Sequence, residues 1–188
     1  MQLPPDTYIE YGGQFESAAE ATRMITLLSI LSIMAIFVAL YMEFKNFRQV
    51  LLVMVNLPLA LIGGIVLVAL TDGIISIASL VGFITLFGIA VRNGIIMVSH
   101  YNHLMEEEGK TLKEAVLQGS VERLNPILMT ALTTGLALLP LALAADKPGS
   151  EIQAPMSIVI LGGLLTATFL NMIVIPVLFQ KWGMVKKS

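Results

Sequence analysis

The chain has 188 residues, of which 56% are hydrophobic and 13% are charged, and its mean hydropathy is +0.86. A soluble domain of this length rarely has so apolar a composition, so the sequence indicates an integral membrane protein. There is no cysteine, which excludes disulfides, thiolate metal sites and cysteine nucleophiles. The sequence also shows no phosphate-binding glycine loop, nucleophile elbow, HExxH motif or basic nucleic-acid surface.

Five stretches are long enough to cross about 30 Å of hydrocarbon, which takes about 20 helical residues. They are residues 24–42, 50–70, 74–104, 126–145 and 154–179. The predicted fold is therefore all-α, a polytopic transmembrane helix bundle over residues 24–183. A polar, acidic segment, residues 1–23, precedes the bundle, and a short tail, residues 184–188, follows it.

A short amphipathic helix is predicted between the third and fourth spans, at residues 111–123. Thr111 and Glu114 match the S/T-x-x-E capping box that begins many helices. Apolar and polar residues then recur at helical spacing, which is typical of a helix lying parallel to the membrane surface. We therefore expect five spanning helices plus one cytoplasmic interfacial helix.

Basic residues are divided unequally between the two sides of the predicted bundle. Eight follow the first, third and fifth spans: Lys45, Arg48, Lys110, Lys113, Arg123, Lys181, Lys186 and Lys187. Only Arg23 and Lys147 lie on the other side, where acidic residues predominate. The positive-inside rule thus predicts a periplasmic amino terminus and a cytoplasmic carboxyl terminus. Because no cleavable signal peptide is visible, either the first span exports residues 1–23 or the chain is cut from a longer protein.

Arg92 interrupts an otherwise uncharged apolar run that begins at Gly73. A cation near the centre of a bilayer costs about 2.5 to 3.5 kcal/mol on insertion scales, so it is expected where an anion, a polar helix face or water compensates it. None of the other four predicted spans contains Asp or Glu. The sequence therefore predicts that the anionic partner of Arg92 comes from outside this chain.

Glycines and prolines punctuate the predicted spans. Small residues let helix backbones approach closely, so we expect helix packing at the paired glycines Gly63, Gly64, Gly162 and Gly163. Pro58, Pro140 and Pro176 remove a backbone donor and should kink or loosen their helices.

Metal binding is the weaker interpretation of the histidines and methionines. His100 and His103 are three residues apart, a spacing that places two imidazoles on one helix face, but the chain has only these two histidines. The eleven methionines are scattered, which favours packing over a soft-metal site. Neither a metal site nor a cofactor is predicted.

The motifs around Arg92 resemble the carboxyl-terminal membrane half of resistance-nodulation-division (RND) efflux pumps. The resemblance is carried by residues 88–100, 103–109 and 123–132, with residues 12–17 and 57–64 in the same pattern. Residues 149–155 and 161–163 are similar to the heavy-metal efflux branch rather than the multidrug branch. The resemblance extends, with the motifs in the same order, from about residue 12 to residue 183.

The resemblance implies one half of an RND transmembrane domain in the bacterial inner membrane. Pumps of this family have twelve spanning helices in two related halves, with periplasmic domains after the first and seventh helices. This chain would hold helices eight to twelve, residues 1–23 would lead from a missing porter domain, and the amino-terminal half of the pump would be its partner. The full-length protein would be a homotrimer with a periplasmic adaptor and an outer-membrane channel.

The resemblance also implies a proton relay that includes Arg92, Asn93, Arg123 and Thr130. In the family, acidic residues on the fourth helix pair with a basic residue on the tenth, and Arg92 occupies that basic position. Multidrug pumps usually have lysine there, and heavy-metal pumps vary. Arginine stays charged at any relevant pH, so Arg92 would pair and switch without carrying the transferred proton.

The function implied is proton-driven export of heavy-metal cations by a transporter, not an enzymatic reaction. One alternative is an RND exporter of organic compounds with the same architecture. Another is a free-standing five-helix membrane protein. The chain alone is expected not to transport, since the acidic side of the relay and the substrate domains are missing from it.

Overall fold

The computed structural model describes residues 14–71, 73–145 and 147–182. Within these ranges the chain forms helices and no strands: α1 (Gln14–Phe44), α2 (Phe47–Met54), α3 (Asn56–Leu70), α4 (Ile77–Glu106), α5 (Leu112–Ala142) and α6 (Gln153–Trp182). Five stretches of helix are long and apolar enough to cross a membrane, one of them formed by α2 and α3 together. The predicted all-α bundle of five spanning helices is therefore confirmed. Most of the predicted amino-terminal segment (residues 1–13 of 1–23) and the predicted tail (184–188) lie outside the described residues.

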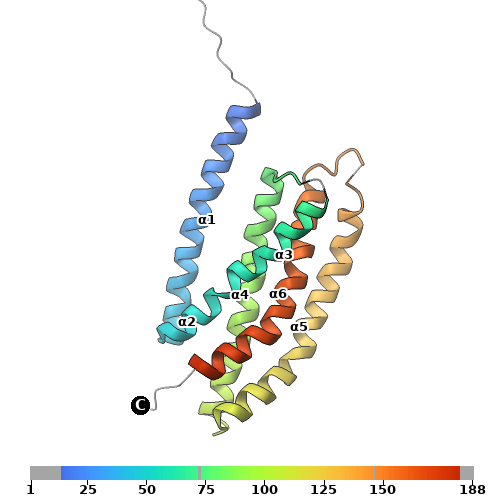
Figure 1. Ribbon diagram of the computed structural model, residues 1–188. Helices are drawn as coiled ribbons and strands as arrows, with labels where there is room; N and C mark the ends of the chain where they lie inside the picture. The colour runs from blue at the N-terminus through green and yellow to red at the C-terminus, as the bar shows by residue number, and fades with distance from the viewer. Residues whose placement is uncertain (1–13, 72, 146, 183–188) are drawn as a thin grey trace, which may run out of the picture.

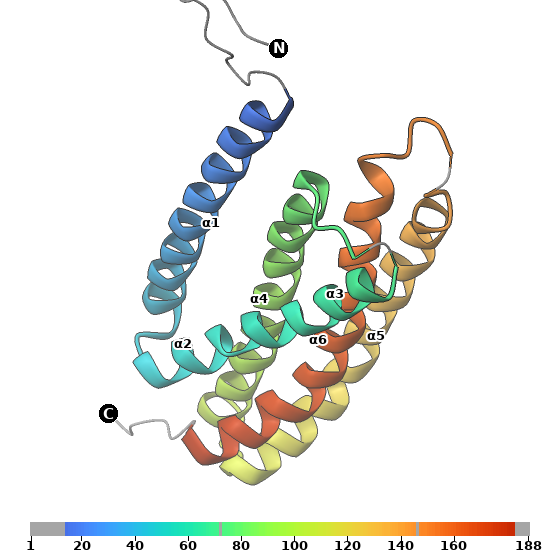
Figure 2. The ribbon, with the colours of Figure 1, turned by 45° about the horizontal axis from the view of Figure 1, so that its top comes forward.

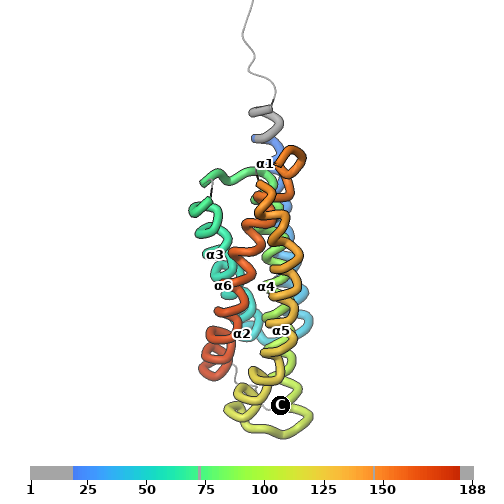
Figure 3. Tube along the Cα trace, turned by 90° about the vertical axis from the view of Figure 1, so that its right-hand side faces the viewer, coloured from blue at the N-terminus to red at the C-terminus, as the bar shows by residue number. Residues whose placement is uncertain are grey.

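The centre of the bundle is built from α3, α4 and α6 (Figure 1). Helix α6 contacts α3, α4 and α5, and the core between them contains the fully buried Leu86, Ala90, Val159 and Ala167. Helix α1 contacts only α2 and α4 among the described helices and leans away from the bundle toward its amino-terminal end (Figures 1 and 2). Seen from the side, α5 and α6 run along each other over most of their length (Figure 3).

The second span is broken into α2 and α3 at Val55. The cause lies at Pro58, which has no N–H to donate to the carbonyl of Met54 and so interrupts the helical hydrogen bonding one turn earlier. Beside the break, the Asn56 side chain donates from Nδ2 to the carbonyl oxygen of Ala90 on α4, at 3.1 Å. The loosening predicted at Pro58 is thus a break between two short helices.

The predicted capping box is present at the start of α5. The backbone N–H of Glu114 donates to Thr111 Oγ1 at 3.4 Å, and the N–H of Thr111 donates to Glu114 Oε2 at 3.0 Å. The chain reaches this cap through Gly109, whose φ of +65° lies in the left-handed region that glycine adopts easily.

The predicted interfacial helix, residues 111–123, does not exist as a separate element. Helix α5 continues from Leu112 through Pro126 to Ala142, and its first turns run obliquely before the helix rises beside α6 (Figure 1). This amphipathic part packs on α4: Ala115 and Gly119 are buried, and a Cβ at Gly119 would come within 2.7 Å of the Tyr101 ring. The segment is therefore the packed first part of α5, and its contact with α4 is one that local sequence does not encode.

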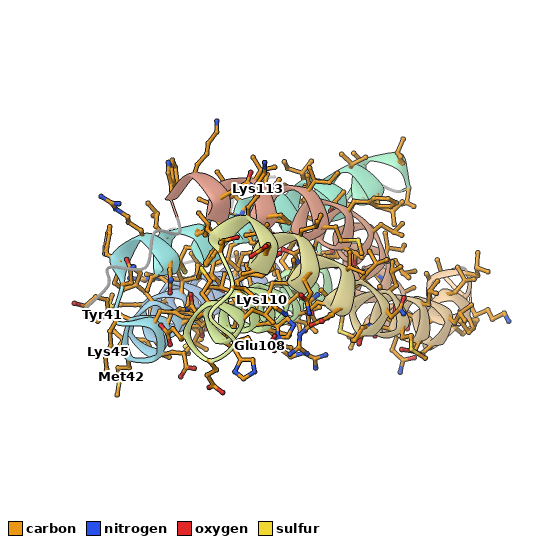
Figure 4. All side chains as sticks on the ribbon, turned by 90° about the horizontal axis from the view of Figure 1, so that it is seen from below. Tyr41, Met42, Lys45, Glu108, Lys110 and Lys113 are labelled. Carbon is orange, nitrogen blue, oxygen red and sulfur yellow. The ribbon has the colours of Figure 1, made fainter. Side chains whose placement is uncertain are left out.

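Basic side chains gather at the end of the bundle formed by the α1–α2 and α4–α5 turns. Figure 4 looks onto this end, with Lys45, Lys110 and Lys113 labelled around it. The amino-terminal end of α1 and the α3–α4 and α5–α6 loops lie at the opposite end (Figures 1 and 2). We refer to the first as the α4–α5 end.

Candidate functional site

Arg92 lies on a stripe of α4 that the other helices leave uncovered. Val81, Thr85, Gly88 and Arg92 are all exposed, and the stripe continues through the half-buried Ile96 and Ser99 to the exposed His103. These positions recur every three or four residues, so they share one face of the helix. No hydrogen bond or ion pair joins Arg92 to any other residue in the part of the chain that the structure describes. Arg92 is thus far from either end of the apolar run in the sequence, and its side chain is nevertheless exposed on the surface of this chain.

The backbone on the opposite side of α4 at this level is firmly packed. Asn93 is 3% exposed, Ala90 is fully buried, and the carbonyl of Ala90 accepts the hydrogen bond from Asn56 on α3. A buried amide paired to a backbone carbonyl ties two helices together. The α3–α4 contact therefore fixes the rotation of α4 and with it the direction in which Arg92 is presented.

Arg123, the second predicted relay arginine, contacts His100 rather than Arg92. Its Nη2 lies 3.3 Å from His100 Nδ1, while His100 Nε2 lies 2.6 Å from Glu122 Oε2. The imidazole side chain is largely buried, at 13% exposure, and the Glu122 side chain is 44% exposed. His100 therefore bridges the two consecutive residues Glu122 and Arg123 of α5.

A chain of polar contacts leads from Glu122 to the α4–α5 end. Gln118 Nε2 donates to Glu122 Oε1 at 2.7 Å, Lys110 Nζ donates to Gln118 Oε1 at 2.6 Å, and Lys110 also pairs with Glu108 at 2.5 Å. Figure 4 shows Lys110 and Glu108 close together in this region. Each contact is short, so the Glu122 carboxylate is held in place from both sides.

Thr130, the fourth predicted relay residue, lies about two helical turns beyond Arg123 on α5. Its hydroxyl donates to the carbonyl oxygen of Pro126 at 2.9 Å, a bond within its own helix. His100 is eight residues beyond Arg92 on α4, which corresponds to about 12 Å along the helix axis. The structure therefore pairs Arg123 with His100 and leaves Arg92 and Thr130 apart from that contact.

An open groove of about 560 Å³ lies beside this cluster. It is lined by Ile95, Ile96, Ser99, His100, His103 and Arg123. The two imidazole rings stack with their centroids 6.3 Å apart, but the Arg123 guanidinium shares the groove with them. In the described part of the chain no three His, Asp or Glu residues gather with metal-ligand geometry.

Of the predicted packing glycines, Gly63 and Gly162 meet at the contact between α3 and α6, and Gly64 and Gly163 lie against side chains of α4. A Cβ at Gly63 would overlap the carbonyl oxygen of Gly162, and one at Gly64 would come within 2.7 Å of Phe83. A Cβ at Gly163 would overlap the Leu86 side chain. Space at these positions is therefore limited to a hydrogen atom.

His100 and Glu122 are the residues of this cluster that the sequence did not single out as relay members. The signal available was a histidine two turns beyond Arg92 and a carboxylate next to Arg123. The sequence does not show that α4 and α5 cross at this level, so it could not tell a contact between His100 and Glu122 from two unrelated polar residues.

Comparison with known proteins identifies the family. Residues 1–182 match the AcrB/AcrD/AcrF family. The chain is 42% identical over 179 residues to Protein HelA of Legionella pneumophila, covering 95% of this chain and 17% of that protein. It is 38% identical over 180 residues to the cobalt-zinc-cadmium resistance protein CzcA of Cupriavidus metallidurans, covering 96% of this chain and 17% of that protein.

A solved structure, the X-ray crystal structure of a heavy metal efflux pump in crystal form II, aligns with a TM-score of 0.83 and 40% identity. The alignment covers 97% of this chain and 18% of that one. The chain therefore spans less than a fifth of the length of these relatives. It belongs to the AcrB/AcrD/AcrF family, which confirms its resemblance to the heavy-metal branch of the RND efflux pumps.

Proposed function

We propose that this chain forms the carboxyl-terminal membrane half of a proton-driven inner-membrane exporter of heavy-metal cations. Two similar proteins are named for metal resistance or metal efflux, which favours metal cations over organic compounds as the substrate. The complete transporter would be a trimer working with a periplasmic adaptor and an outer-membrane channel. The gathering of Lys45, Lys110 and Lys113 at the α4–α5 end supports a cytoplasmic location for that end.

The observation that carries this proposal is the uncovered stripe of α4 around Arg92. An arginine on an apolar, unpartnered helix face is costly in a membrane unless a carboxylate meets it. The complementary half of the transporter would supply that carboxylate on a helix lying along Val81, Thr85, Gly88 and Arg92. Protonation of the carboxylate would weaken its attraction to Arg92 and allow the two halves to repack, so that proton entry drives export.

The experiment is metal export by the complete transporter carrying Arg92→Ala, with Arg92→Lys as the charge-preserving variant. We expect Arg92→Ala to reach the membrane and lose proton-coupled metal export, because the carboxylate loses its counter-ion, while Arg92→Lys retains part of it. Arg48→Ala is the matched control, since Arg48 is also exposed but lies near the start of α2.

Unchanged export by Arg92→Ala would refute the relay role. Comparing the metal and drug sensitivity of a strain lacking the transporter separates the metal exporter from an exporter of organic compounds. Expression of the 188-residue chain with and without the complementary half tests the remaining alternative, a free-standing five-helix protein, because only that alternative functions without the other half.

A further inference from the structure

The contacts around His100 fit one tautomer of its neutral ring. The Arg123 guanidinium can only donate, so His100 Nδ1, 3.3 Å from Arg123 Nη2, must be the acceptor. The proton of the neutral ring is then on Nε2, which donates to Glu122 Oε2 at 2.6 Å. Both contacts are satisfied by one tautomer of the neutral imidazole.

Protonation of the ring is incompatible with one of these two contacts. A second proton on Nδ1 would point at the N–H groups of Arg123, leaving two donors and two positive charges face to face. The contact of Nε2 with the Glu122 carboxylate would instead gain an opposite charge. The imidazolium would therefore keep Glu122 and lose Arg123.

Arg123 is held weakly enough to leave. Its Nε is buried and has no hydrogen-bond partner among the described residues, and no carboxylate lies within ion-pair distance of its guanidinium there. The open groove beside it leads along Ser99 and Ile96 in the direction of Arg92, so a released side chain has room to move.

The groups that surround His100 support a local effect. From α5 it faces Glu122 and Arg123; on α4 the next histidine, His103, is exposed and pairs with Glu107 at 3.1 Å. Lys110 is separated from Glu122 by Gln118. Helices α2 and α6 meet this end of α4 through uncharged groups: Gln49 of α2 is hydrogen-bonded to Asn102, and Phe179 of α6 packs against Tyr101. The residues of α1 that pack on the core are also uncharged, namely Ile36, Phe37, Leu40 and Phe44.

We propose that His100 is a proton-dependent positioning residue for Arg123, which holds the guanidinium against α4 when neutral and releases it into the groove when protonated. The significance for transport rests on the proposed function, because Arg123 is a predicted member of the relay. The contact itself belongs to this chain and is tested in it.

The first experiment is solid-state NMR of the 188-residue chain in lipid bilayers, with nitrogen-15 in histidine and carbon-13 in arginine. The chain has two histidines, so His103→Gln leaves His100 as the single labelled ring. At high pH we expect a ring protonated on Nε2 alone and a through-space contact between Nδ1 and the Arg123 guanidinium carbon. When the pH is lowered until the nitrogen-15 signals show that the ring has gained its second proton, the contact should disappear.

A neutral ring protonated on Nδ1, or a guanidinium contact that survives full protonation, would overturn the proposal. His100→Gln supplies a second test, because its carboxamide can accept from Arg123 and donate to Glu122 without titrating. In that variant, with isotope labels on the introduced glutamine and on arginine, the contact should persist at every pH, and its loss at low pH would contradict the assignment.

The second experiment measures metal export by the complete transporter as a function of pH. His100→Gln should change the pH profile of export relative to the unsubstituted transporter, while His103→Gln should leave that profile unchanged. Equal effects of the two variants would count against a specific role for His100. If Arg92→Ala leaves export intact, the proposed function fails and the NMR result still decides whether His100 positions Arg123.

Discussion

Gly63 and Gly162 face each other across the α3–α6 contact, so closely that a Cβ on either would overlap the carbonyl oxygen of the other. A backbone atom is an obstacle on both sides, and at Gly63 the Thr166 side chain lies equally close. Such a contact cannot relax by a change of rotamer, and the two helices must move apart to admit a methyl group.

We expect Gly162→Val to destabilise the chain by about 1 to 3 kcal/mol, the usual cost of overpacking a core. Besides the Gly63 carbonyl, the added side chain meets Leu67, whose own Cβ lies 2.7 Å from the point where a Cβ at Gly162 would stand. The free energy of unfolding in detergent, followed by circular dichroism during denaturant titration, measures the effect. Gly135→Ala is the control, because its nearest neighbour would be Leu161 Cδ2 at 3.9 Å. Equal stability of the two variants would show that the α3–α6 contact tolerates separation.

Gly88 lies one turn before Arg92 on the uncovered stripe, and a Cβ there would meet no atom of this chain within 4 Å. Gly88→Leu should leave the stability of the isolated chain unchanged or raise it by up to about 1 kcal/mol, since leucine is the better helix former. In the complete transporter the same substitution should abolish metal export, because a helix of the other half would have to pack against it. Thermal unfolding of the chain and metal export by the transporter test the two statements separately, and Gly88→Ala should show a smaller loss of export. Normal export by Gly88→Leu would mean that no helix covers this face.

Two buried asparagines differ in what they contact. Asn56 donates to the Ala90 carbonyl, whereas neither amide atom of the fully buried Asn171 has a partner among the described residues. Asn56→Leu should therefore cost about 0.5 to 2 kcal/mol, and Asn171→Leu should be neutral or stabilising, because it removes an unsatisfied polar group. Unfolding titrations of both variants in the same detergent provide the comparison. A loss of stability in Asn171→Leu as large as that in Asn56→Leu would indicate that the Asn171 amide is bonded after all.

Local structure was predicted well from the sequence because it depends on a few neighbouring residues. The capping box of Thr111 and Glu114 is present, and the loosening expected at Pro58 is a break at Val55. The prediction of a separate interfacial helix was wrong, since residues 112–123 are the first part of α5. Nothing in the sequence before Pro126 marks an end to that helix, and in the structure Gly119 packs closely on Tyr101.

The sequence alone determined the all-α membrane class, the number of long apolar helices in the described part of the chain and the isolation of Arg92 from any acidic residue in the other predicted spans. These follow from hydrophobic length and charge, which are read along the chain. Only the tertiary structure decided that Arg92 is on an uncovered face and that Arg123 meets His100. Spans that are apolar nearly all round do not specify which face turns inward. The rotation of α4 is fixed by close contacts such as that of Asn56 with Ala90, and these exist only once the helices have packed.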